Sequence, residues 1–230
     1  IAPDNAKLHS NMGTALCALG RLEEAHSSYK KAVSLAPEFA EAHANMSAVL
    51  LSLGRTEEAV VCGYRAVELD PSNADAANNL GASLTDQGNE IEAIGHYRRA
   101  IAIKPGFARA HLNLGFALKT SWWVQEALDS YDRVIALDPN AMDARTHRLF
   151  LLSYLPDPAY EKAFQEACQY GMLAAGNARP CEYWTNPKDP EKCLRIGMVS
   201  GDFKIHPVGL FIEGVMAALS AHHSPRLEVY

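Results

Sequence analysis

A repeat of 34 residues runs through most of this 230-residue sequence. Several residue types recur at that interval along the chain. The recurring positions are Pro3, Pro37, Pro71, Pro105 and Pro139; Asn11, Asn45, Asn79 and Asn113; Leu16, Leu50, Leu84 and Leu118; Ala25, Ala59, Ala93 and Ala127; Glu24, Glu58, Glu92 and Glu126; and Gly20, Gly54 and Gly88. Coincident columns at one period of this length predict a solenoid of helix–turn–helix units.

Each unit is predicted to contain two helices. The apolar positions of the first unit lie at helical spacing: Met12, Leu16 and Leu19, then Ala25, Tyr29, Ala32 and Val33. Gly20 ends the first helix, where a positive φ is often needed, and Pro37 stops the second. The complete units are expected at residues 6–39, 40–73, 74–107 and 108–141. This pattern resembles the tetratricopeptide repeat (TPR) family, whose units stack into a right-handed superhelix with a concave groove.

Several positions depart from the repeat, among them Trp122, Gly63 and Val134, which replaces the small Ala of the other units. Trp122 stands where the other units have Gly, so Trp122 and Trp123 could form an exposed patch. We favour a remodelled turn in which one indole packs inward. Gly63 replaces the aromatic residue of the other units, and we expect the neighbouring Tyr64 to turn inward in its place.

Composition argues against several classes of function. The net charge is −6, from 21 basic and 27 acidic side chains, which disfavours binding to nucleic acid. No apolar run approaches the ~20 residues that a membrane span needs. The five cysteines are odd in number and form no Cys-x-x-Cys pair, so we expect reduced thiols in a cytoplasmic protein and no metal site.

The four repeated asparagines all fall on the first helix of their units. Stacking would align them as a ladder along the groove: Asn11, Asn45, Asn79 and Asn113. An amide side chain offers a donor and an acceptor, so the ladder could hold the backbone of an acceptor peptide. Equally, these asparagines could tie adjacent helices together. A second column, His9, His43 and His111, is interpreted as helix-interface packing, because stacking keeps successive repeats too far apart for a metal.

After residue 141 the period fades. Residues 142–193 are predicted to form a helical extension and a linker, with helices at 145–155 and 159–175 and a connector at 176–192. The second of these helices has a rough apolar face, made of Ala163, Phe164, Ala167, Tyr170 and Leu173.

Residues 194–230 are predicted to begin an α/β domain. The apolar run 193–200 has the length of a strand, 208–221 has helical periodicity, and 227–230 begins another strand. This order predicts a right-handed βαβ unit with parallel strands. Ligands of such sheets bind beyond the carboxyl ends of the strands, where the loop 201–207 would lie.

The second part of the chain carries a more specific resemblance. Tyr154-Leu155-Pro156-Asp157 after the repeats, and LRIGMVSGDFKIHPVG at 194–209, resemble the bacterial protein O-GlcNAc transferases and the wider SPINDLY-like group. That resemblance implies a TPR superhelix joined to a two-lobed GT-B region. It implies inverting, metal-independent transfer of N-acetylglucosamine from UDP-GlcNAc to Ser or Thr of proteins, with no cofactor. Most donor contacts would lie in a second lobe, so residues 1–230 are expected to be inactive alone.

The resemblance also implies an active-site loop. His206 matches the family's His-Pro motif, and Asp202, Pro207 and Gly209 lie in the same stretch. A neutral imidazole could take the proton of an attacking hydroxyl. Pro207 suits the first turn of a helix, whose positive end would keep His206 neutral. Alternatively, His206 caps that helix or orients the acceptor, and Asp202 only shapes the turn.

Two other functions stay open at this point. A SPINDLY-type transferase could use another sugar, such as fucose. A non-catalytic TPR adaptor would bind proteins without chemistry.

Overall fold

The computed structural model describes residues 5–155 and 159–177, which form ten helices. The helices are α1 (Ala6–Ala18), α2 (Leu22–Leu35), α3 (Ala40–Ser52), α4 (Thr56–Leu69), α5 (Ala74–Asp86), α6 (Glu90–Ile103), α7 (Ala108–Thr120), α8 (Val124–Leu137), α9 (Met142–Leu152) and α10 (Ala159–Asn177). The predicted helical solenoid is confirmed for this part of the chain. The predicted βαβ unit at 194–230 lies outside the described residues.

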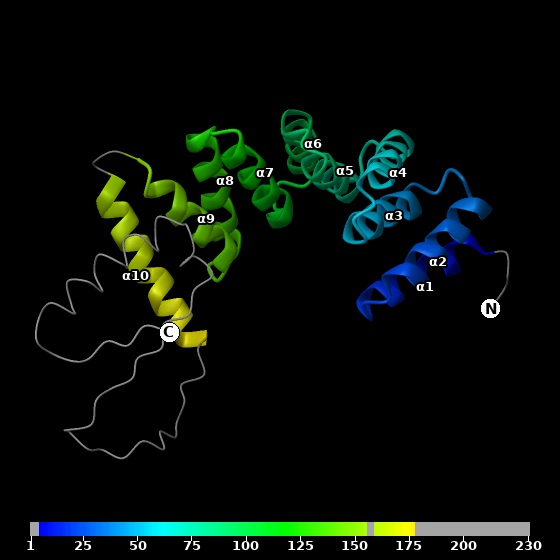
Figure 1. The fold of residues 1–230 in the computed structure, drawn as a ribbon, viewed down its shortest axis with the longest axis horizontal. Coiled ribbons are helices and arrows are strands. Elements are labelled where there is room, and N and C mark those ends of the chain that lie inside the picture. The colour runs from blue at the N-terminus through cyan, green and yellow to red at the C-terminus, as the bar shows by residue number, and fades with distance from the viewer. Residues whose placement is uncertain (1–4, 156–158, 178–230) are drawn as a thin grey trace, which may run out of the picture. The chain divides into compact units, whose positions relative to one another are not determined.

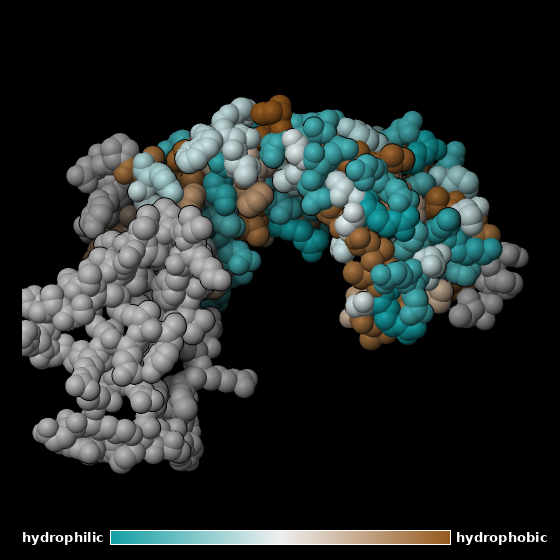
Figure 2. Space-filling view, in the orientation of Figure 1, coloured by the Kyte–Doolittle hydropathy of each residue, from teal (hydrophilic) through white to brown (hydrophobic). Residues whose placement is uncertain are grey.

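The first eight helices form four pairs that follow one another along the chain (Figure 1). Each second helix contacts its own first helix and the first helix of the next pair. First helices of successive pairs also contact one another, whereas no such contact joins α2, α4, α6 and α8. The first helices therefore line one face of the stack and the second helices the other. Hydrophilic residues cover most of the face visible in Figure 2, with hydrophobic ones scattered among them.

The turn inside each pair depends on a residue with positive φ. Gly20, Gly54 and Gly88 have φ of 72°, 72° and 86°, and Trp122 has φ of 60° at the equivalent position. The Trp122 N–H bonds to Lys119 O at 3.1 Å, as the Gly20 N–H does to Cys17 O at 2.9 Å. The expectation of a remodelled turn with an inward indole is therefore wrong. The turn keeps its geometry, and neither indole packs inward, because Trp122 and Trp123 are 65% and 41% exposed.

A tyrosine of the second helix packs flat against a glycine of the first in three of the four pairs. The contacts are Tyr29 on Gly13, Tyr97 on Gly81 and Tyr131 on Gly115. A Cβ on these glycines would lie 2.6–2.8 Å from the ring, so a larger residue would push the helices apart.

The second pair solves this contact differently. It has Ser47 in place of the glycine and Gly63 in place of the tyrosine. The Ser47 hydroxyl is buried and donates to Ala59 O at 2.7 Å, while Leu80 of α5 closes over Gly63. The expectation that Tyr64 turns inward is wrong. Tyr64 is 42% exposed, and its hydroxyl donates to Glu92 of the next pair.

A side chain caps the carbonyl of each described proline in the repeat column. Nε2 of His43 donates to Pro37 O, and Nε2 of His111 donates to Pro105 O, both at 3.0 Å. Two arginines cap the remaining two prolines, as Arg145 Nε to Pro139 O at 3.1 Å and Arg99 Nη2 to Pro71 O at 2.7 Å. These donors satisfy carbonyls left free where the helix stops at proline. His43 and His111 therefore have a structural role, and Arg99 compensates for Ala77, which breaks the histidine column.

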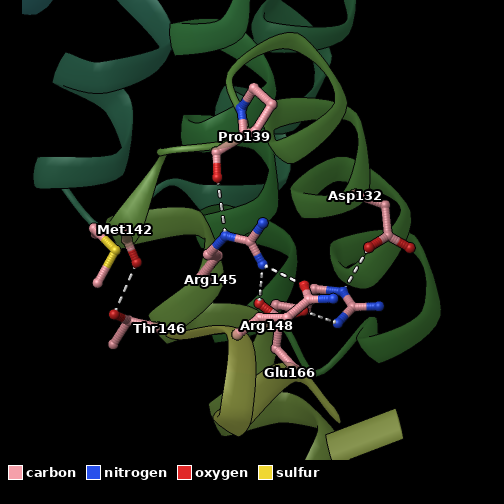
Figure 3. Close-up of polar contacts among 8 residues, drawn as sticks. Asp132, Pro139, Met142, Arg145, Thr146, Arg148 and Glu166 are labelled. Atoms are coloured by element: carbon pink, nitrogen blue, oxygen red, sulfur yellow. Dashed lines mark hydrogen bonds and ion pairs between the residues drawn. The ribbon is translucent and has the colours of Figure 1, made fainter. Parts of the chain in front are cut away.

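A buried ionic cluster joins α10 to the last helices of the stack (Figure 3). Glu166 of α10 binds Arg145 at 2.7 Å and Arg148 at 2.8 Å. Arg148 also binds Asp132 of α8 at 2.5 Å, and Arg145 donates to Gln169 at 3.1 Å. The side chains of Arg145 and Glu166 are only 8% and 7% exposed, so the two charges depend on each other.

The predicted apolar face of α10 is wrong at its centre. Phe164 is 61% exposed and Ala167 is also exposed, whereas Glu166 between them is buried. The arginines of α9 hold the helix at Glu166, and Ala163 of the predicted face packs against the hydrophobic core. Arg145 holds the column position of His43 and His111, and its longer side chain reaches both the proline carbonyl and α10.

Removing Glu166 should detach α10. Glu166→Ala leaves the buried Arg145 guanidinium without its counter-charge, which should lower the free energy of unfolding by about 3–5 kcal/mol. Hydrogen exchange should show the loss in α9 and α10 first, because each repeat contacts only its neighbours. The matched control is Glu68→Ala, which removes an exposed ion pair: the side chains of Arg65 and Glu68 are 41% and 70% exposed. This control should lower the free energy of unfolding by only about 0.2–1 kcal/mol. Equal effects of the two substitutions would contradict this account.

The packing at Gly63 gives a second test. Gly63 and Gly95 both lie inside second helices, but a Cβ at 95 meets nothing within 4 Å, whereas one at 63 meets Leu80 atoms at 3.0–3.2 Å. Gly95→Ala should stabilise the protein by about 0.5–1 kcal/mol through helix propensity alone. Gly63→Ala should not stabilise the protein in this way, because the close contact with Leu80 of α5 offsets the gain in helix propensity. Thermal unfolding of both variants measures the difference, and a similar gain at both positions would show that α5 yields freely.

Candidate functional site

The repeated asparagines lie on the first helices, which line one face of the stack. Asn11 is exposed, whereas Asn45, Asn79 and Asn113 are half-buried. Nδ2 of Asn79 donates to Ala44 O of α3 at 3.2 Å. Asn45 differs from Asn79, because the structure shows no hydrogen bond to the Asn45 amide within the described residues.

A chain of amides crosses three first helices. Nδ2 of Asn113 in α7 donates to Oδ1 of Asn78 at 3.0 Å, and Nδ2 of Asn78 lies 3.5 Å from Oδ1 of Asn79. Asn78 is 1% exposed and forms the centre of this chain. The sequence pattern did not indicate it, because its column otherwise holds small or apolar residues. The only signal was the doubled Asn at 78–79.

This network supports helix tying as one role of Asn79 and Asn113. It does not exhaust their hydrogen-bonding capacity, because each NH₂ group has a second N–H. Oδ1 of Asn113 accepts no hydrogen bond within the described residues. The peptide-binding role of the four asparagines stays a prediction.

An open pocket of about 450 Å³ lies on the same face. Its lining comes from α3, α5, α6 and α7: Leu51, Ala82, Thr85, Asp86, Tyr97, Asn113 and Phe116. Polar and apolar groups line it in about equal measure, and the amide of Asn113 and the carboxylate of Asp86 are among the polar ones. Volumes of this order with few convergent polar groups are typical of ligand sites.

Three polar groups of the pocket already make hydrogen bonds. The hydroxyls of Tyr97 and Thr85 lie 3.0 Å apart in a hydrogen bond, and burial raises the pKa of Tyr97 to about 12. The Asp86 carboxylate accepts a hydrogen bond from the Thr56 hydroxyl of the preceding pair. The pocket therefore presents fixed groups and a neutral phenol at ordinary pH, and nothing in its geometry suggests proton transfer.

The predicted active-site residues His206, Asp202, Pro207 and Gly209 all lie outside the described residues, so their roles stay predictions. In residues 5–155 and 159–177, no cluster of His, Cys, Asp or Glu could hold a metal ion. No helix in this part of the chain is both long and apolar enough to cross a membrane.

Two repeat models match the chain. The model described as TPR repeat matches residues 13–54 and 83–121, and the one described as tetratricopeptide repeat matches residues 40–73.

Two curated plant proteins show partial similarity. Both are described as probable UDP-N-acetylglucosamine--peptide N-acetylglucosaminyltransferase SPINDLY. The Petunia hybrida protein is 31% identical over 78 residues, which is 34% of this chain and 8% of that protein. The Arabidopsis thaliana protein is 30% identical over 90 residues, which is 39% of this chain and 10% of that protein. The chain thus spans about a tenth of the length of these relatives.

Solved structures share the fold. YrrB, described as a TPR protein with an unusual peptide-binding site, superposes with a TM-score of 0.61 at 22% identity, over 76% of this chain and 90% of YrrB. MamA from Desulfovibrio magneticus RS-1 gives 0.66 at 22%, over 76% and 97%. Pseudomonas aeruginosa PilF gives 0.66 at 23%, over 76% and 78%. The repeat models thus match residues 13–73 and 83–121, and the helix pairs α1 to α8 share the stacked helix-pair fold of these structures.

Proposed function

We propose that this solenoid binds extended segments of acceptor proteins and presents them to a protein O-GlcNAc transferase of which the chain is a part. The observation that carries the binding role is the pocket lined by α3, α5, α6 and α7, where the apolar side chains Leu51 and Phe116 line the same pocket as the Asn113 amide. These apolar side chains can accept a side chain of the peptide, while an amide pairs with its backbone.

Two features of the sequence support the transferase role. The chain has partial similarity to two SPINDLY proteins, and the stretch 194–209 resembles the family's active-site motif. In the proposed reaction a Ser or Thr hydroxyl attacks the anomeric carbon of UDP-GlcNAc. His206 takes the hydroxyl proton, and UDP leaves from the opposite face with inversion. Asp202, Pro207 and Gly209 shape the loop, and the reaction uses no metal or cofactor.

Two alternatives are consistent with the same fold. A SPINDLY-type relative would transfer another sugar, such as fucose, to the same class of acceptor. A TPR adaptor would bind proteins without catalysis, and its support is the likeness to solved TPR proteins such as YrrB. Assays of the full-length protein with UDP-GlcNAc and with a fucose donor separate the three, since the adaptor transfers neither sugar.

The peptide-binding role predicts different results at two asparagines. Asn45→Ala removes an amide with no hydrogen bond in the described structure, so it should weaken peptide binding by about 0.5–1.5 kcal/mol and leave the melting temperature unchanged. Asn79→Ala also breaks the bond to Ala44 O and should lower stability as well. The measurement is fluorescence anisotropy with Ser- and Thr-containing peptides selected on an array. If no peptide binds, or if Asn45→Ala binds normally, the ladder is structural.

The catalytic role predicts a defect in the chemical step. In the full-length protein, His206→Ala should lower kcat by roughly 10²–10⁴-fold if His206 is the base, and the pH profile should lose the limb that reports imidazole ionisation. Transfer by the wild type should continue in EDTA. A raised KM for peptide with an unchanged pH profile would indicate acceptor positioning instead. Normal kinetics would leave His206 as a helix cap.

A further inference from the structure

Four exposed aromatic rings lie at the ends of α7 and α9, three of them in contact and the fourth joined to them through Lys119. This aromatic strip consists of Trp122, Tyr154, Phe150 and Phe116, which are 65%, 60%, 47% and 40% exposed. Ring centroids of Trp122 and Tyr154 are 6.1 Å apart, and those of Tyr154 and Phe150 are 5.0 Å apart. Phe116 also lines the pocket, so the strip continues into that site. Exposed apolar surface of this extent is typical of interaction sites.

The backbone of Trp122 supports a role outside the fold. Its φ of 60° lies in the left-handed region, where the other three turns have Gly. A side chain with a Cβ is disfavoured there, and strain of this kind is often found at functional sites. Burial of the indole does not offset this backbone strain, because most of the ring faces solvent.

Lys119 places a positive charge in the strip. Its ammonium lies 4.7 Å from the centroid of Phe116 and 5.6 Å from that of Phe150, and it donates to Nδ1 of His147 at 3.2 Å. Burial lowers the pKa of Lys119, and the same burial lowers the pKa of His147. No carboxylate of the described residues pairs with Lys119, so this cation is available to an acidic group of a ligand.

We propose that the aromatic strip binds a proline-rich segment of a partner protein that carries an acidic residue beside its prolines. Aromatic-lined surfaces bind polyproline II segments because the segment is preformed and loses little entropy. Two residues of a polyproline II helix advance about 6 Å, close to the 6.1 Å between the ring centroids of Trp122 and Tyr154. The acidic residue pairs with Lys119.

The polar groups of the strip fit the same ligand. A polyproline II backbone has no internal hydrogen bonds, so its carbonyls can accept from outside. The described structure gives no hydrogen bond to the indole N–H of Trp122 or to the hydroxyl of Tyr154, and both can donate. The strip shares Phe116 with the pocket of the proposed function, but it uses neither the asparagine column nor residues 194–209, so its test does not depend on sugar transfer.

The test uses the 230-residue chain and a fluorescein-labelled peptide, Pro-Pro-Glu-Pro-Pro-Pro, in fluorescence anisotropy. Trp122→Gly restores the residue of the other three turns, so the melting temperature should stay equal or rise while affinity falls about tenfold or more. Lys119→Gln should weaken binding of this peptide and not of its Glu→Gln version. Replacing the prolines of the peptide by Gly should abolish binding.

Several results would overturn the proposal. The first is that the wild-type chain does not bind the peptide at concentrations up to about 1 mM. The second is that the peptide with Gly in place of Pro binds equally well. The third is that Trp122→Gly binds the peptide with unchanged affinity. A fall in melting temperature for Trp122→Gly would assign the indole to the fold. Faster proteolysis within residues 178–230 of that variant would assign the strip to the chain's own segment. Loss of a wild-type dimer in sedimentation would assign it to a second copy.

Discussion

Close approach of helices through columns of alanine is the contact on which the rest of the described structure depends. Ala25, Ala59, Ala93 and Ala127 of the second helices, and Ala42, Ala76, Ala110 and Ala144 of the first helices, are all 0% exposed. Because a methyl group is the only side chain at these positions, neighbouring helices can pack backbone to backbone. The tyrosine rings on Gly13, Gly81 and Gly115 use the same principle within a pair. The asparagines, the pocket and the aromatic strip are placed by this stacking.

The repeat made the helices and their order predictable, because their determinants are local. Proline stops, left-handed turns and apolar spacing all act within one unit, and the period shows each of them several times. The incorrect predictions concern contacts that occur at one place in the chain and are not repeated in the other units. Tyr64 does not replace the missing ring, because Leu80 of the next pair closes over Gly63. Glu166 is buried because two arginines of α9 surround it, and no repeat of α10 exists to show that pattern.

The candidate site was predictable only in part for the same reason. The asparagine column is visible in the sequence, but its use depends on residues outside the column. Asn78 accepts from Asn113, and this bond exists only because α5 has Asn where the other first helices have Ser10, Ala44 and Leu112. The pocket lining combines four helices, so periodicity within one helix could not define it. The roles of His206 and its loop rest on the resemblance and belong to the proposal.

Phe116 connects the two surfaces of this face. Its ring lines the pocket, and it also holds Lys119 within the aromatic strip. A peptide in the pocket would contact the Phe116 ring on the side that faces α5, while a partner on the strip would contact it beside Lys119. Two ligands that share one side chain cannot bind independently, and linkage requires each to change the affinity of the other by the same factor. The fourth repeat is therefore where binding along the solenoid would become sensitive to a second partner.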